Sequence, residues 1–170
     1  MPIILPSPAL FPEMWAKAAV RHTRSIMGIP SNKLGDGSEN ACLAEVRRNV
    51  AAAGMEDSAT MTDRLATHAS ANKCGNCGEY AAVTFQFLKR RKCPFLLELA
   101  YYEKGSLDHA FVIINRDDTA PLSTPSKWGD HCWIADAWSN DTIHGKTYRT
   151  NMVALGGSVP DPKVSTWHVP

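Results

Sequence analysis

The hydrophobic pattern of this chain changes from helical to extended partway along its 170 residues. Before Pro94, good helix formers with spaced apolar residues predict four helices, at 13–27, 41–53, 57–70 and 77–92. After Pro94, β-branched and aromatic runs predict three strands, at 95–102, 109–115 and 131–138. Helices that precede strands, rather than alternate with them, indicate the α+β class.

The chain length fits a single domain over residues 1–170. We expect a proline-rich arm at 1–12, a helical part at 13–70, and a last helix with its sheet at 71–170. Loop-forming residues fill 30–40 and 116–130, and Gly54 is a plausible helix stop. The tail at 147–170 has room for one or two further short strands.

Bulk composition excludes several classes of protein. The net charge of +1 gives no electrostatic reason to bind nucleic acid or an acidic membrane surface. No apolar run is long enough for a membrane span. The first residues lack a basic region and are interrupted by prolines, so we expect no Sec signal peptide. A signal read by a specialised secretion system would leave no such pattern.

Five cysteines, at positions 42, 74, 77, 93 and 132, raise the question of redox state. An odd number cannot form a fully paired intrachain framework. Without a Sec signal, we interpret them as mostly reduced thiols. Each is then a core residue, a metal ligand or a nucleophile.

Cys77 has the strongest local signs of a nucleophile. Asn76 is a good helix N-cap, and Glu79 follows three residues later, as in a capping box. Cys77 therefore falls in the first helical turn, where the positive end of the helix stabilises a thiolate. Gly75 and Gly78 leave room for a substrate carbonyl, and the Cys77 N–H can help to bind an oxyanion.

A thiolate nucleophile needs a base, and the base needs a group that orients it. His109 opens the hydrophobic run HAFVII, and a strand holds a base rigidly. Asp136 lies within the apolar run WIADAW, where a carboxylate is costly unless it is paired. We predict Cys77, His109 and Asp136 as the catalytic residues, with Asp130 and Asn140 as competitors of Asp136.

Three segments resemble the transglutaminase-like superfamily. CGNCGEYA at 74–81 resembles the nucleophile segment of cytosolic peptide N-glycanases. DHAF at 108–111 and IADAW at 134–138 resemble the later segments of that family, in the same Cys, His, Asp order. The resemblance covers residues 70–140, and it implies a papain-like α+β fold with additional N-terminal helices.

The compact chain is also similar to the bacterial toxin and type III effector members of this papain-like group. The resemblance implies a hydrolase or acyl transferase that works through a thioester, with no cofactor and no metal. It favours a monomeric effector that deamidates glutamine in a host protein. A cysteine protease and a transglutaminase are the alternatives. The resemblance implies delivery by a specialised system into the cytosol of a target cell. If the chain is not exported in this way, we expect a cytoplasmic protein.

A zinc-stabilised binding module is the main alternative of another class. Cys74 and Cys77, with Cys93 and either Cys132 or His131, have the residue types of a four-ligand zinc site. A pseudoenzyme that keeps the fold and binds a partner is a third possibility. The sequence also leaves open which residue would be the second oxyanion donor, and Asn72 and Asn76 are the candidates.

Overall fold

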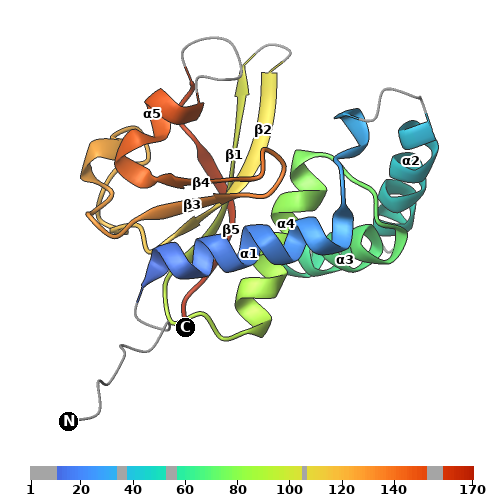
Figure 1. Cartoon of the computed structure of the whole chain (residues 1–170), viewed down its shortest axis with the longest axis horizontal. Coiled ribbons are helices and arrows are strands. Elements are labelled where there is room, and N and C mark those ends of the chain that lie inside the picture. Colours follow the sequence, from blue (N-terminus) through green and yellow to red (C-terminus); the bar gives the residue numbers. More distant parts are fainter. Residues whose placement is uncertain (1–10, 34–37, 53–56, 105–106, 153–158) are drawn as a thin grey trace.

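The computed structural model describes residues 11–33, 38–52, 57–104, 107–152 and 159–170. Its α-helices are α1 (Pro12–Met27), α2 (Ser38–Ala51), α3 (Ser58–Asn72), α4 (Cys77–Arg90) and α5 (Tyr148–Asn151). Its strands are β1 (Leu97–Lys104), β2 (Leu107–Ile114), β3 (Trp133–Asp136), β4 (Asp141–His144) and β5 (Lys163–His168). Short 3₁₀ helices lie at Ser31–Lys33, Pro125–Lys127 and Gly145–Thr147. The predicted α+β class is confirmed (Figure 1).

The strands form one antiparallel sheet in the order β4-β3-β2-β1-β5. β1 and β2 pair along their whole length, from Leu97 opposite Ile114 to Lys104 opposite Leu107. β3 pairs only with the last three residues of β2, starting at Val112. The first half of β2, which carries His109, therefore extends beyond the end of β3.

Each face of the sheet carries its own hydrophobic core. Ala110, Val112 and Ile114 of β2 pack on the side of α1, α3 and α4. Phe111 and Ile113, which alternate with them, belong to a second core that includes Trp128 and Tyr148. This alternation follows from the two-residue period of a strand. The chain therefore builds helix, sheet and an irregular layer with α5 in that order (Figure 1).

Helix α4 is the central element of the helical layer. Its buried residues run along nearly the whole helix, and it packs against α1, α3, β1 and β2. Tyr80, Phe85 and Leu88 are fully or almost fully buried. A helix that is buried on most sides has a fixed position, so the residue at its start is fixed as well.

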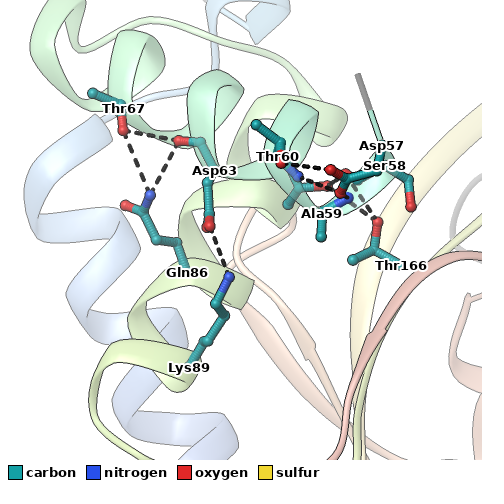
Figure 2. A network of polar contacts seen from close by, with 10 residues as sticks. Asp57, Ser58, Ala59, Thr60, Asp63, Thr67, Gln86, Lys89 and Thr166 are labelled. Carbon is teal, nitrogen blue, oxygen red and sulfur yellow. Dashed lines mark hydrogen bonds and ion pairs between the residues drawn. The ribbon is translucent and has the colours of Figure 1, made fainter. Parts of the chain in front are cut away.

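Polar contacts fix α3 against α4 and β5 (Figure 2). Lys89 of α4 forms an ion pair with the Asp63 carboxylate at 2.7 Å, and Gln86 Nε2 donates to the Asp63 carbonyl at 3.1 Å. Thr166 Oγ1 of β5 donates to the Ser58 carbonyl at 3.3 Å. These contacts hold α3 against the helix and the strand on either side of it.

The predicted elements are confirmed with a few corrections. The four long helices and the strands β1, β2 and β5 occur where they were expected, whereas β3 is shorter than the predicted 131–138. The sequence prediction missed β4 because only one residue of DTIH is buried, which hides its periodicity. Residue 12 is not part of an arm: Pro12 opens α1, as proline at the first helical position favours. Residues 1–10 and Gly54 lie outside the described residues.

Cys42 and Cys74 form a disulfide between α2 and the segment that precedes α4. Their Cα atoms are 6.3 Å apart. The interpretation of the cysteines as mostly reduced is therefore wrong for this pair, while Cys77, Cys93 and Cys132 are free thiols. The pairing depends on how α2 packs beside the end of α3, which a sequence spacing of 32 residues does not reveal.

We expect Cys42→Ser/Cys74→Ser to lower the free energy of unfolding by about 3 kcal/mol, because the unfolded chain loses a closed loop. Urea unfolding of the oxidised protein and of the double variant measures this difference. Cys93 is buried, so Cys93→Ser would itself change stability and cannot serve as the control. The second comparison is the wild-type protein with its disulfide reduced. Equal midpoints for all three samples would contradict the expectation.

Candidate active site

Cys77 is the first residue of α4, as predicted, and its side chain is half-buried. The predicted capping box is present, and the Asn76 N–H donates to Glu79 Oε2 at 2.8 Å. The first N–H groups of a helix have no partner within the helix. The Cys77 sulfur and the Cys77 N–H therefore lie at the positive end of a buried helix.

The two glycines beside Cys77 have different roles. A Cβ at Gly75 would overlap the Glu79 side chain, so Gly75 allows the close approach that the capping box requires. The expectation that Gly75 makes room for substrate is thus replaced by a packing role. A Cβ at Gly78 would meet nothing within 4 Å. Gly78 is therefore the glycine that leaves open space beside the sulfur.

His109 and Asp136 form a buried hydrogen bond, with 2.7 Å between His109 Nε2 and Asp136 Oδ2. Each side chain is only 2% exposed. The β2–β3 register explains the pairing: Val112 lies opposite Ala135, so the next pair along would be Phe111 and Asp136. His109 is then the diagonal neighbour of Asp136 on the same face of the sheet.

Cys77 and His109 line the same cavity and interact electrostatically, so Cys77, His109 and Asp136 form a line of three side chains. Because Asp136 occupies Nε2, Nδ1 is the ring nitrogen left for the sulfur. Burial lowers the pKa of His109, but the hydrogen bond with Asp136 and the interaction with Cys77 outweigh it and raise the pKa to about 9. The imidazolium is therefore the favoured form at neutral pH, and a positive ring stabilises a neighbouring thiolate.

Trp138 covers the buried pair. Its ring meets the His109 ring edge to face, with 5.2 Å between the ring centroids. Lys33 Nζ lies 3.7 Å from the centroid of the Trp138 ring and donates to the Trp138 carbonyl at 3.1 Å. Trp138 is half-buried and lies against the His109 ring. It serves as a wall that separates the His109–Asp136 hydrogen bond from solvent.

Asn32 lies beside Asn76 and near Cys77, and sequence analysis did not select it. Its backbone N–H donates to Asn76 Oδ1 at 3.0 Å, and its Oδ1 accepts from Trp138 Nε1 at 3.0 Å. Because Oδ1 is engaged, the amide NH₂ is the part of this side chain that remains to donate. Asn32 also lines the cavity in front of Cys77.

A cavity of about 400 Å³ opens above these residues. Cys77, His109 and Asn32 line it, together with Tyr101, Asp108 and Arg47. Arg47 Nε of α2 donates to Glu79 Oε1 at 3.0 Å, which ties α2 to the start of α4. The cavity thus has polar groups of both charges around the sulfur, and its volume lies within the range of ligand-binding pockets.

The competing candidates lie elsewhere. Asp130 is exposed and pairs with Lys146, and Asn140 is exposed in the turn after β3. Asn72 donates its side-chain amide to the His68 carbonyl. Among these residues, Asp136 is the one that contacts His109.

The proposed zinc ligands do not come together. The Cys74 sulfur is bonded to Cys42, and Cys93 and Cys132 are buried. Burial raises the pKa of the Cys93 thiol to about 11 and that of the Cys132 thiol to about 12. Within the described ranges, no three His, Cys, Asp or Glu side chains are grouped so that they could hold a metal ion.

The raised pKa of His109 predicts a loss of stability at alkaline pH. A group whose pKa is higher in the folded protein stabilises it fully below its unfolded pKa of 6.5, and this contribution disappears as the pH rises through about 9. We expect the advantage of the wild type over His109→Gln in unfolding free energy to shrink by about 3 kcal/mol between pH 6 and pH 10. Urea unfolding across this range measures it, and a constant difference would contradict the assignment.

No protein-family model, curated protein or solved structure matches this chain. None of the helices in the described part of the chain is both long and apolar enough to cross a membrane. The chemistry of the site is therefore inferred from its own residues.

Proposed function

We propose that this chain is a cysteine-dependent amide hydrolase or acyl transferase with a papain-like, transglutaminase-like fold. The observation that carries the proposal is the line of Cys77, His109 and Asp136, with its buried 2.7 Å hydrogen bond, at the edge of a cavity. A thiol at a helix start, a base and an orienting carboxylate are the parts that nucleophilic catalysis by cysteine requires.

In the first step, the Cys77 thiolate attacks the carbonyl carbon of an amide, and a C–S bond forms. The carbonyl oxygen becomes an oxyanion. The Cys77 N–H and the Asn32 amide NH₂ are the two donors that we assign to it. Both groups border the cavity, so the oxyanion forms where donors are already in place.

In the second step, the His109 imidazolium gives its proton to the leaving nitrogen, and the C–N bond breaks. Ammonia or an amine departs, and a thioester remains. His109 is then neutral and takes a proton from water, whose oxygen bonds to the thioester carbon. The C–S bond breaks, the carboxylic acid product leaves, and the Cys77 thiolate is restored. An amine in place of water gives transamidation. Asp136 accepts from His109 Nε2–H throughout and fixes the tautomer that presents Nδ1 to the sulfur.

The favoured substrate is a protein glutamine side chain, which is deamidated to glutamate. The resemblance of 74–81, 108–111 and 134–138 to the transglutaminase-like superfamily supports this choice. Arg47 and Asp108 at the cavity suit a polar amide group rather than a purely apolar one. The same resemblance is the basis on which we propose export by a specialised system, and the Cys42–Cys74 disulfide is consistent with passage through an oxidising compartment.

The test uses denatured β-casein as a surrogate substrate, with intact mass spectrometry and an ammonia assay. Deamidation releases ammonia and leaves the chain at full length with a small gain in mass. Fragments would instead indicate a protease, and adducts of added putrescine a transglutaminase. If wild type and Cys77→Ala give the same spectra on casein and on a whole-cell protein extract, the proposed activity fails.

We expect Asn32→Ala to lower kcat by about 100-fold with little change in KM, because an oxyanion donor acts mainly in the transition state. Steady-state ammonia release from casein measures both constants. Asn72→Ala is the matched control, since that amide contacts the His68 carbonyl instead. An unchanged kcat in Asn32→Ala would remove Asn32 from the oxyanion site.

A further inference from the structure

A second cavity of about 440 Å³ lies beside the start of α4 and is lined by residues of α2, α3, α4 and strands β1, β2 and β5. Its lining is almost wholly apolar and includes Met61, Leu65, Ala82 and Leu99. The catalytic steps above use none of these side chains. An apolar cavity of this size at the surface needs an explanation, because protein cores are otherwise closely packed.

The space exists because α4 carries its smallest residues here. Gly78 and Ala82 are one helical turn apart and line the cavity. A Cβ at Gly78 would meet nothing within 4 Å, so neighbouring side chains do not fill the gap. Larger residues at these two positions would have extended the hydrophobic core into it.

Polar contacts fix the positions of the elements that surround the cavity. Figure 2 shows Thr166 of β5 beside Ser58 at the start of α3, and Gln86 and Lys89 of α4 beside Asp63. Thr62 and Thr166 share a hydrogen bond of 3.2 Å between their hydroxyl oxygens. The polar groups of the wall are thus engaged with one another, which leaves apolar surface toward the cavity.

The second cavity borders the one in front of Cys77. Gly78, Tyr101 and Ala110 line both. Gly78 directly follows Cys77, and Ala110 directly follows His109. A polypeptide with an amide at the sulfur can therefore place a neighbouring side chain in the apolar cavity.

We propose that this cavity is a specificity subsite that binds one large apolar side chain, such as leucine or phenylalanine, of the substrate segment next to the attacked amide. The subsite rests on the proposed function, because it has meaning only if Cys77 attacks an amide. It gives the enzyme a substrate class: protein segments in which the target amide is followed or preceded by a large apolar residue. Burial of apolar surface supplies the selectivity.

The probes are iodoacetamide and its N-methyl, N-butyl and N-hexyl derivatives, applied to the full chain. Peptide mass spectrometry follows alkylation of Cys77, and N-acetylcysteine gives the intrinsic reactivity of each probe. We expect the rate at Cys77, relative to N-acetylcysteine, to rise about tenfold or more from methyl to hexyl. If Cys77 reacts faster than N-acetylcysteine but its relative rate is the same for every probe, the subsite is overturned and the proposed function is not. A Cys77 no faster than N-acetylcysteine with every probe would count against the proposed function itself.

Two variants change the cavity in opposite directions. Ala82→Leu fills it and should bring the hexyl-to-methyl ratio down to that of N-acetylcysteine. Met61→Ala widens it, so the relative alkylation rate at Cys77 should continue to increase from the N-hexyl to an N-octyl probe. This variant tests the subsite if Ala82→Leu does not fold. Thr67→Leu, an exposed position on α3 outside this cavity, is the control and should keep the wild-type ratio. Unaltered ratios in both cavity variants would overturn the proposal.

Discussion

Cys77→Ala is expected to abolish amide turnover, with kcat lowered by about 10⁵-fold or more. The sulfur forms the thioester, so no other group can replace it in the proposed steps. The half-buried side chain loses only its sulfur, and alanine is well suited to the first turn of a helix. Ammonia release from casein measures the loss, and circular dichroism with a melting curve shows that the fold is kept.

Cys93→Ala is the matched control for this variant. Cys93 is a free thiol buried in the core between the helices and the sheet. Its loss should lower stability slightly and leave turnover per folded molecule at the wild-type value. Turnover that survives in Cys77→Ala would contradict the assignment of the nucleophile.

Asp136→Asn is expected to lower kcat by about 10³- to 10⁴-fold, with a smaller effect on KM. The Ser139 N–H donates to Asp136 Oδ1 at 3.1 Å, so an asparagine would keep its oxygen at that position. Its NH₂ would then face His109 Nε2. The ring would have to accept there and carry its proton on Nδ1, which is the wrong tautomer for taking a proton on the side of Cys77.

The same substitution removes the negative charge that helps to raise the pKa of His109. The alkaline limit of activity should therefore move to lower pH in Asp136→Asn. Asp130→Asn is the control, because Asp130 is exposed and pairs with Lys146 rather than with His109. A pH–rate profile of each variant decides between the two carboxylates. An active Asp136→Asn beside an inactive Asp130→Asn would reverse the assignment.

Local signals carried much of the sequence prediction. The cap at Asn76 and Glu79 marks a helix start within a few residues, and it placed Cys77 correctly at the first position of α4. The strand around His109 was recognisable because its residues are apolar on both faces. Both β2 faces are buried in this structure, one against the helices and one against the second core.

The contacts that surround the three predicted residues could not be predicted. Asn32 lines the cavity in front of Cys77 because α1 and the following turn pack beside the start of α4, where Ser31 and Gly75 exchange hydrogen bonds. The Cys42–Cys74 disulfide and the pairing of Arg47 with Glu79 depend on the position of α2 in the same way. Each of these joins residues about 30 positions or more apart, for which a single sequence has no periodic signal.

The most direct test of the Cys77–His109–Asp136 assignment is the rate of iodoacetamide alkylation at Cys77 between pH 5.5 and pH 10. A protonated His109 beside the sulfur should make Cys77 react much faster than N-acetylcysteine at pH 6. The rate should then change little until His109 loses its proton near pH 9, and His109→Gln should lose the advantage at pH 6. A wild-type rate that rises with pH in parallel with N-acetylcysteine, with no advantage at pH 6, would contradict the assignment.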